Sequence, residues 1–466
     1  MSLTTSHFVP FDREDVWDWH TRNGAVVRLS PPFAPMTPVK QAERLSDGTT
    51  VFSLPAGLKW VARHDLSGYR RGHRFTDVCV SAPLRSLSNW RHVHTFADAP
   101  GGTVITDEVS TRVPGSTLTG LFAYRQHQLF EDLKFLRRMS VYTSPEFRDA
   151  EGGPRSLTIA VTGTGGTVGR ALCAQLGTAG HTVVRLRRGP VRRDSGDKAR
   201  TWNPVDPDPS LLDGVDVLVH LAGEPLLGRF TESHKRAIRD SRTAPTRYLA
   251  ELVAASPTCQ TMVSASAIGF YGHDRGDELL TDTSAAGDGF LAEVCRDWER
   301  ACQSATDAGK RVVTIRTGIV LAGTGGVLPL LKMLFSAGLG GKFGDGSIWF
   351  SWISLDDLTD IYCRAVVDTA LTGPVNATAP HPVRNAEMTQ KLARELNRPA
   401  FLQIPALGPK LLLGSEGAEQ IALANQRVIP TVLESLGHTF RHPTIGDALA
   451  HELGGEDLLG SRGSAP

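Results

Sequence analysis

Residues 157–170 read LTIAVTGTGGTVGR, and this stretch decides the fold of the chain around it. It begins as an apolar, β-branched run, which indicates a buried parallel strand, and it ends in the start of a helix. Between the two, Gly163, Gly166 and Gly169 recur at intervals of three. A dinucleotide site needs such glycines, because a strand must turn tightly into a helix and the backbone must approach a pyrophosphate without Cβ atoms. An ordinary glycine-rich turn is the alternative interpretation.

The helix that follows the turn would offer unpaired N–H groups and a positive dipole to phosphates. We therefore predict an α/β Rossmann fold, a doubly wound parallel sheet, with a cofactor at its first turn. The contacts expected from the turn are made by Gly163, Thr164, Gly165, Gly166, Thr167, Val168 and Gly169.

Two arginines follow the second expected strand, residues 182–186. In dinucleotide folds this strand end faces the adenosine ribose, where an acidic residue binds the 2′-hydroxyl and an arginine accommodates a 2′-phosphate. Arg187 and Arg188 stand here, and no Asp or Glu does. The sequence thus favours NADP over NAD, with Arg188 the better candidate and Arg187 able to point to solvent.

The composition is that of an ordinary globular protein of 466 residues, with 50 Lys and Arg against 49 Asp and Glu. This balance gives no support to a nucleic-acid or acidic-membrane partner. No apolar run reaches the roughly 18 residues of a membrane span, and the N-terminus lacks the pattern of a signal peptide. Six scattered cysteines without a Cys-x-x-Cys pair indicate reduced core residues of a cytoplasmic protein, and neither a zinc site nor disulfides are expected.

The first 150 residues follow a different plan. A short helix over residues 11–20, with Asp12 as its cap, is expected first, and an amphipathic helix over residues 118–138 is expected last. Between them, alternating segments separated by turn residues predict strands. These segments are 48–54, 58–66, 74–80, 88–96 and 102–113.

This plan resembles the helix-grip fold of the START and polyketide-cyclase-like superfamily (SRPBCC), with residues 75–78 and 90–96 as its paired strands. The resemblance implies an α+β domain whose sheet and long helix enclose an apolar cavity for a small hydrophobic ligand. His92 and His94 alternate on one strand and share a face, so they are able to bind a metal or a polar ligand group. With no obvious third ligand, solvated or hydrogen-bonded histidines are the preferred interpretation, and no metal is predicted.

From residue 156 to about 452 the chain resembles an atypical branch of the extended short-chain dehydrogenase/reductase superfamily, whose members are often labelled nucleoside-diphosphate-sugar epimerases. The motifs that carry the resemblance are HLAGEPL (220–226), RFT (229–231), SRT (241–243), SASAIGFYG (264–272), RTGIVL (316–321) and SWI (351–353). The resemblance implies a cofactor bound at the strand ends. Further cofactor contacts are expected from Leu221, Ala222, Gly223, Glu224 and Ser264.

The catalytic groups of that superfamily are only partly present. Its members use a Tyr as proton donor, a Lys four residues later that lowers the Tyr pKa, and a Ser or Thr at the reacting oxygen. Here Phe290 takes the Tyr position and Val294 takes the Lys position, and neither donates a proton. Either Ser264 or Ser266 is able to bind the substrate oxygen or to satisfy backbone groups, and Ser266 is the favoured one. Tyr271 is an alternative acid, with cleft packing as its structural interpretation.

Other polar residues have two interpretations each. Arg316 follows an expected strand and is able to bind an anion or to form a structural ion pair. Lys235 and Arg242 lie about two helical turns apart, which is typical of a solvated face, and Cys295 is expected to be a small buried hydrophobe. The glycine-rich loop at 338–346 suits a lid or a dimer contact.

The expected domains are a helix-grip domain (1–150), a Rossmann domain (156–380), a small helical extension on the substrate side (381–452) and a disordered tail (453–466). Three functions are compatible with them. The first is an NADP-dependent oxidoreductase or epimerase acting on a small molecule. The second is a catalytically silent protein that senses NADP(H) and binds a ligand, and the third is a carrier arrangement in which the N-terminal pocket passes an apolar compound to the cofactor domain.

Overall fold

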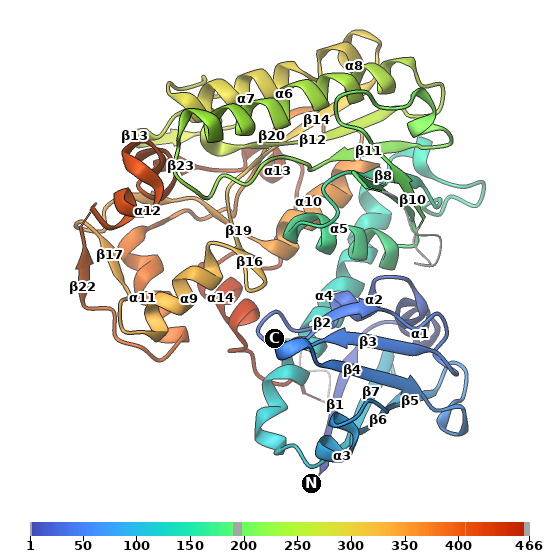
Figure 1. Cartoon of the computed structure of the whole chain (residues 1–466). Coiled ribbons are helices and arrows are strands. Elements are labelled where there is room, and N and C mark those ends of the chain that lie inside the picture. The colour runs from blue at the N-terminus through green and yellow to red at the C-terminus, as the bar shows by residue number, and fades with distance from the viewer. Residues whose placement is uncertain (1, 190–197, 406, 461–466) are drawn as a thin grey trace. The chain divides into compact units, whose positions relative to one another are not determined.

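The computed structural model describes residues 2–189, 198–405 and 407–460 (Figure 1). The chain forms two compact units. Unit 1 consists of Met1–Met139, Ala174–Gly180 and Ala450–Pro466, and unit 2 consists of Ser140–Cys173 and His181–Leu449. Each unit is described separately below.

Unit 1 contains a seven-stranded antiparallel sheet in the order β1-β7-β6-β5-β4-β3-β2. The central hairpin joins β6 to β7 through a turn at Gly101, whose φ of 79° favours glycine. The strands are β1 (Ser2–Val9), β2 (Thr37–Lys40), β3 (Thr49–Ser53), β4 (Lys59–His64), β5 (Arg74–Cys79), β6 (Arg91–Ala99) and β7 (Gly102–Ser110).

Apolar side chains of one sheet face pack against helices of unit 1. The helices are α1 (Arg13–Thr21), α2 (Ala25–Arg28), α3 (Leu84–Ser88) and α4 (Thr119–Tyr142). Trp17 and Trp19 of α1, Phe96 of β6, and Leu129 and Leu133 of α4 belong to one buried cluster. The expected order of short helix, antiparallel strands and long helix is therefore observed.

Two details of unit 1 differ from what the sequence indicated. Strand β1 was not expected, because residues 2–9 include a run of Thr and Ser that gives no regular apolar alternation, and the strand forms by pairing with β7. Asp12 does occupy the N-cap position of α1, but its side chain makes no capping hydrogen bond.

Unit 2 contains a seven-stranded parallel sheet in the order β10-β9-β8-β11-β12-β14-β20. All four residues of β11 are buried, as expected for a parallel strand covered on both faces. Helices α6 and α7 cover one face, and α5 and α10 lie on the other (Figure 1). The strands are β8 (Thr158–Val161), β9 (Thr182–Arg187), β10 (Ala199–Thr201), β11 (Val217–His220), β12 (Thr261–Ala267), β14 (Arg311–Thr317) and β20 (Gly373–Ala377). The Rossmann expectation is confirmed.

Along the chain, helices α5 to α10 lie between the strands of this sheet, and α11 to α14 follow β20. They are α5 (Thr167–Thr178), α6 (Glu232–Ala255), α7 (Phe290–Arg300), α8 (Gln303–Asp307), α9 (Leu328–Ser336), α10 (Leu355–Val367), α11 (Asn385–Glu395), α12 (Leu407–Gly417), α13 (Thr431–Ser435) and α14 (Ile445–Leu453). The last residues of α5 and of α14 are counted with unit 1.

Small sheets connect the C-terminal region to the rest of unit 2. β13 pairs with β23, β17 with β22, and β18 with β21, while β15 lies between β16 and β19. Their bounds are β13 (Asp274–Leu280), β15 (Ile319–Ala322), β16 (Gly325–Gly326), β17 (Gly341–Phe343), β18 (Trp349–Phe350), β19 (Trp352–Ser354), β21 (Val383–Arg384), β22 (Leu402–Ile404) and β23 (Asn425–Val428). Residues 381–449 are therefore tied by strand pairing into unit 2.

The expectation that residues 453–466 are disordered is wrong for residues 453–460, the part of this segment that the structure describes. Gly460 accepts a backbone hydrogen bond from Phe8, and the N–H of Leu459 donates to the side chain of Gln126. These bonds hold residues 454–460 within unit 1, and the remainder of the expected tail, 461–466, lies outside the described residues. Among the described helices, none has the length and apolarity needed to cross a membrane.

Candidate functional site

The order of the parallel sheet identifies one crevice. Successive strands run outward from β8 in one direction through β9 and β10, and in the other direction through β11, β12, β14 and β20. The connections thus reverse between β8 and β11. In open α/β sheets ligands bind at this switch point, outside the carboxyl ends of the strands.

Gly163 lies at this crevice with a φ of 69°, a conformation that favours glycine. A Cβ atom at position 163 would lie 2.8 Å from the carbonyl carbon of Leu221 and 2.9 Å from the nitrogen of Ala222. Only glycine allows the two strand ends to approach so closely. Gly169 has a similar role, because its Cβ would lie 2.2 Å from the Gly163 carbonyl oxygen.

The other two glycines of the turn leave space above the backbone. Gly165 and Gly166 are exposed, and a Cβ on Gly165 would meet no atom within 4 Å. The first N–H groups of α5, which begins at Thr167, have no partner within the helix. An open cradle of glycine backbone before a helix N-terminus fits the phosphates of a dinucleotide.

Two neighbouring groups complete the turn. Thr162, which was not predicted as a site residue, accepts hydrogen bonds at its Oγ1 from the N–H groups of Leu221 and Ala222, at 3.0 and 3.2 Å. The same hydroxyl contacts His220 Nδ1 at 2.8 Å, and burial lowers the pKa of His220 to about 3, so that its ring is neutral. The bonds of one threonine at the end of β8 therefore hold the end of β11 in place.

The loop after β11 is held by α6. The backbone N–H of Glu224 donates to Ser241 Oγ at 2.9 Å, and Arg242 donates to the Glu224 carbonyl oxygen at 2.9 Å. Arg242 is buried and lies over the ring of Trp298, so the expectation of a solvated face is wrong for this residue. Gly223 and Glu224 remain exposed at the crevice, as a cofactor contact requires.

Arg187 and Arg188 are exposed at the carboxyl end of β9. Their position next to the turn strand β8 agrees with the place where a dinucleotide fold holds the adenosine ribose. Residues 190–197, which follow them, are not described.

The helix α7 begins at Phe290, the residue that the sequence resemblance aligns with the catalytic tyrosine of the superfamily. Lys235 Nζ lies 5.3 Å from the centre of the Phe290 ring, and Val294 is buried. Lys235 also contacts Glu416 at 3.0 Å and Glu232 at 3.2 Å, and these carboxylates raise the pKa of its ammonium. From the sequence, Lys235 was expected on a solvated face of its helix. In the structure, its ammonium group on α6 lies beside Phe290, the residue aligned with the superfamily's tyrosine.

Ser266 belongs to a buried network between β12, α7 and β14. Its hydroxyl donates to Glu299 at 2.7 Å, and Arg316 donates to both carboxylate oxygens of Glu299 at 2.8 Å. Burial opposes the charge of Arg316, but the contacts with Glu299 outweigh it and raise the guanidinium pKa. Of the two interpretations of Arg316, the ion pair is the observed one.

The assignment of Tyr271 as a catalytic acid is corrected by its surroundings. Its side chain is fully buried, and its hydroxyl donates to Asn376 at 2.6 Å and accepts from Arg316 at 3.1 Å. Burial raises the pKa of Tyr271 despite the neighbouring guanidinium. All of these bonds of the hydroxyl are made to groups of the fold itself, which is the arrangement of a structural tyrosine.

The side chain of Ser264 also faces the interior, contrary to its expected contact with a cofactor. It is fully buried, and its hydroxyl donates to the carbonyl oxygen of Ala265. Alternation along β12 places it on the same face as Ser266, toward α7. Cys295 of α7 is buried as expected, and burial raises the pKa of its thiol to about 12.

Unit 1 contains a second candidate site, a cavity of about 340 Å³. Most of its walls are apolar, with side chains from β3, β4, β5 and α4, including Phe52, Trp60, Phe75 and Phe122. Asp77, His92 and His94 lie at one part of the wall. An apolar cavity with a few convergent polar groups is the usual form of a small-molecule site.

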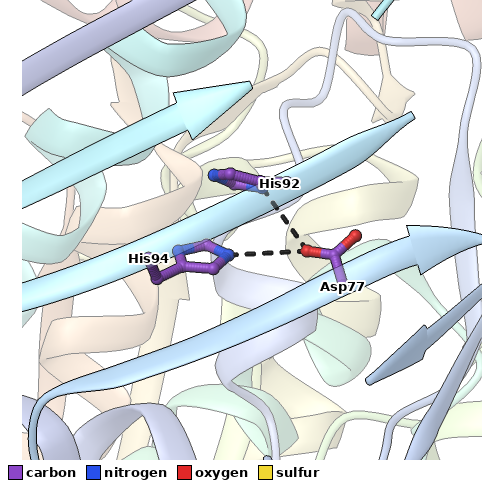
Figure 2. A group of neighbouring side chains, drawn as sticks. All are labelled: Asp77, His92 and His94. Atoms are coloured by element: carbon purple, nitrogen blue, oxygen red, sulfur yellow. Dashed lines mark ion pairs between the residues drawn. The ribbon is translucent and has the colours of Figure 1, made fainter. Parts of the chain in front are cut away.

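The polar part of this wall continues into a buried cluster. Figure 2 shows Asp77 of β5 directed toward His92 and His94 of β6. Behind the histidines, Asp107 of β7 lies 2.8 Å from His92 Nε2 and 2.9 Å from His94 Nδ1. Burial opposes ionisation, but these contacts hold the pKa of Asp107 well below its usual value and raise that of His94, whereas burial lowers the pKa of His92.

Comparison with known proteins gives two family matches. Residues 159–376 match the NAD dependent epimerase/dehydratase family, and residues 404–452 match a domain of unknown function (DUF1731). An epimerase family protein of Mycobacterium bovis is 41% identical over 296 residues, which cover 63% of this chain and 96% of that protein.

Two crystal structures are also similar. That of the nucleoside-diphosphate sugar epimerase from Corynebacterium glutamicum is 60% identical with a TM-score of 0.85, covering 98% of this chain and 91% of that one. That of the human epimerase family protein SDR39U1 with NADPH is 29% identical with a TM-score of 0.59, covering 64% of this chain and 99% of that one.

Proposed function

Because this chain belongs to the epimerase family, we propose that unit 2 binds NADP(H) at the crevice between β8 and β11 and transfers hydride to or from a small molecule. The observation that carries the proposal is the close approach of Gly163 to Leu221 and Ala222, beside an open glycine backbone. When bound, the nicotinamide cofactor would supply the hydride chemistry. The glycine backbone and the start of α5 would hold its pyrophosphate.

The preference for NADP(H) rests on charge at the end of β9. Arg187 and Arg188 are exposed there, and guanidinium groups suit a 2′-phosphate. The human SDR39U1 structure contains NADPH, which agrees with this proposal. The scattered, buried cysteines support a cytoplasmic location.

The substrate reaction is proposed at the level of oxidation, reduction or epimerisation. Phe290 and Val294 supply no proton, and Tyr271 is buried. Lys235 and Arg239 of α6 both lie over the Phe290 ring. Lys235 is the candidate proton donor of the two because an ammonium is able to release a proton, although its carboxylate neighbours raise its pKa and so make it a weak acid until a substrate displaces them.

The absence of the superfamily's Tyr and Lys, with Phe290 and Val294 in their places, supports a second candidate function. In this function the protein senses NADP(H) without turnover. Measurement of hydride exchange under single-turnover conditions distinguishes the two, since a sensor binds NADPH but exchanges no label with any sugar nucleotide or apolar carbonyl compound.

For unit 1 we propose an SRPBCC-like module that binds a small hydrophobic molecule. Its support is the antiparallel sheet with the long helix α4 and the apolar cavity of about 340 Å³. An apolar fluorescent probe tests it, because binding should be lost when Phe122→Trp fills the cavity and retained when the exposed Val141 is changed to Trp.

Calorimetric titration with NADPH tests the cofactor proposal. Gly166→Asp should abolish measurable binding, because it adds a negative charge where the pyrophosphate would lie. Gly115→Asp adds the same charge where a Cβ would meet no atom within 4 Å and is the matched control. Equal affinity of both variants, or no binding of NADPH or NADH to the parent chain, would contradict the proposal.

The 2′-phosphate contact has its own test. Arg188→Ala should weaken NADPH by roughly tenfold, the value of a lost charged contact of about 1.4 kcal/mol, and leave NADH unchanged. An equal loss for both cofactors would show that Arg188 does not read the 2′-phosphate.

A further inference from the structure

We propose that Asp77, His92 and His94 bind a divalent metal ion of the zinc class at the wall of the cavity in unit 1. The proposal is independent of the cofactor role of unit 2. It rests on the register of three strands, the spacing of the ligand atoms and the position of the cavity.

The register places four polar residues on one sheet face. Asp77 of β5 is paired with His92 of β6, and His94 is paired with Asp107 of β7. Directly paired residues of antiparallel strands share a face, and His92 and His94 share one because they are two apart. The two histidines are therefore flanked by one carboxylate on each side.

Asp107 orients both imidazole rings from behind. Its Oδ1 atom lies 2.8 Å from His92 Nε2 and 2.9 Å from His94 Nδ1. A carboxylate oxygen accepts, so these nitrogens carry the ring hydrogens, and in neutral rings His92 Nδ1 and His94 Nε2 are left with lone pairs. A carboxylate that fixes the far nitrogen of a histidine is the usual support of a metal-binding imidazole.

The lone-pair nitrogens face the second carboxylate at a distance unsuited to direct bonding. Asp77 Oδ2 lies 3.5 Å from His92 Nδ1 and 3.6 Å from His94 Nε2, whereas N–H···O bonds measure about 2.7 to 3.2 Å (Figure 2). Ligand atoms about 2.1 Å from a tetrahedral zinc ion lie about 3.4 Å from one another. The two distances from Asp77 Oδ2 to the histidine nitrogens thus fit atoms that share one ion.

Asp77 is itself held in position. Trp90 Nε1 donates to its other oxygen, Oδ1, at 3.2 Å. This bond leaves Oδ2 directed toward the histidines. One ligand atom from each of the three residues lies within 4.8 Å of those of the other two, as a shared ion requires.

The cavity supplies the remaining coordination position. Asp77, His92 and His94 line it together with apolar side chains such as Trp60, Leu118 and Phe122. Three protein ligands with an open fourth position characterise zinc sites that bind water or a substrate atom. The ligand class that fits is an apolar molecule with one carboxylate, carbonyl or hydroxyl oxygen, which would coordinate the ion while its body fills the cavity.

The charges also match. Asp77 and Asp107 are buried or nearly so, and when both imidazoles are neutral a dipositive ion would balance the charges of these two carboxylates. The alternative to a metal ion is a proton on His94 Nε2, which would lie between this ring and the Asp77 carboxylate. The experiment below distinguishes a proton from a metal.

The test uses the full chain after treatment with a chelator. Calorimetric titration with Zn²⁺ should show one equivalent bound per chain, and Co²⁺ should give the intense visible absorption of a tetrahedral site. Asp77→Asn and His94→Gln, which nearly preserve side-chain size, should each weaken Zn²⁺ by at least about 100-fold and remove the Co²⁺ absorption. Asp107→Asn, a change at a positioning residue, should weaken Zn²⁺ about 10- to 100-fold and shift that absorption.

His64→Gln is the matched control. His64 lines the same cavity, but its Nδ1 atom lies 3.0 Å from the Arg44 carbonyl oxygen, so this variant should bind Zn²⁺ as the parent does. All variants should bind NADPH with unchanged affinity, which separates this proposal from the cofactor proposal.

Two results would overturn the metal site. One is a parent chain that binds no Zn²⁺ at neutral pH and gives no tetrahedral Co²⁺ absorption, which would leave a proton on His94 as the bridging charge. The other is Zn²⁺ binding that survives both Asp77→Asn and His94→Gln, since the ion would then lie elsewhere. If one variant fails to fold, the Co²⁺ absorption of the parent chain and the other variant still decide.

Discussion

Each unit contains a buried cluster of polar side chains, and the two clusters differ in how their atoms are spaced. In unit 2, Glu299 accepts from Ser266 and Arg316 at 2.7 to 2.8 Å, and Tyr271 bonds to Asn376 at 2.6 Å. In unit 1, Asp107 contacts both histidines at similar distances, but Asp77 stands 3.5 to 3.6 Å from them.

This difference separates a structural role from a ligand-binding one. A cluster whose donors and acceptors all lie at hydrogen-bond distance has its polar groups satisfied by the fold. A cluster with a wider interval on the side of a cavity has room for an ion. Residue type alone suggests the opposite assignment, because serine, tyrosine and arginine near a cofactor site resemble catalytic groups.

The largest expected effect is the removal of the carboxylate at the centre of the unit 2 cluster. Glu299→Ala leaves Arg316 buried without its ion-pair partner, which costs about 3 to 5 kcal/mol. Denaturant unfolding measures the loss. Glu293→Ala is the control, because Glu293 forms an exposed pair with Arg239 whose loss costs about 1 kcal/mol or less. Equal losses would show that the cluster is not a structural one.

The second prediction concerns the unit 1 cluster. Zn²⁺ at about 100 times its dissociation constant should stabilise the parent chain by about 2.7 kcal/mol, because only the folded site binds the ion. Scanning calorimetry should show the shift for the parent and for Glu299→Ala, and no shift for Asp77→Asn. The same shift in all three would mean that the two clusters do not differ as proposed.

A smaller effect should follow when single hydroxyl groups leave the unit 2 cluster. Ser266→Ala and Tyr271→Phe should each cost about 1 to 2 kcal/mol, since each removes one partner of a buried polar group. The NADPH affinity should not change. If Tyr271→Phe instead abolished turnover without loss of stability, Tyr271 would be the catalytic acid after all.

The smallest expected effect concerns thiols beside the unit 2 cluster. Burial raises the pKa of Cys295 and of Cys302 to about 12. A raised pKa keeps a thiol neutral as the pH rises, so at pH 8 only about one in ten thousand is a thiolate, the reactive form. Neither cysteine should react with a disulfide reagent until the chain unfolds, and mass spectrometry of labelled peptides measures this. Rapid labelling of Cys295 in the folded chain would indicate an accessible, activated site.

Local sequence patterns predicted the parts of the fold that local physics determines. The glycine spacing at 163–169 and the buried run before it specify a strand, turn and helix, and all three are observed. The long helix α4 and the central strands of unit 1 also follow from periodicity. Strand β1 was missed because it forms by pairing with β7, a partner about one hundred positions away in the sequence.

The site residues depend more on tertiary contacts, which the sequence does not encode locally. His92 and His94 were noticed, but their third ligand, Asp77, comes from another strand, and only the register of β5 against β6 brings it opposite His92. Likewise Tyr271 and Ser266 looked catalytic until Arg316 and Glu299 were found to bind them. The role of Thr162 was predictable from its position. A hydroxyl just before the first glycine of the turn lies at the end of β8, where it is able to bond to the end of the neighbouring strand.

Unit 1 combines segments that lie far apart in the sequence, and this has a consequence for biosynthesis. Leu459 and Gly460 hydrogen-bond to Gln126 and Phe8, yet the ribosome makes them after residues 181–449 of unit 2. Unit 1 therefore lacks these contacts while unit 2 is translated, and unit 2 has the opportunity to fold before they form. Synthesis of residues 450–460, rather than emergence of the first domain, would then mark the moment when the N-terminal sheet gains these bonds.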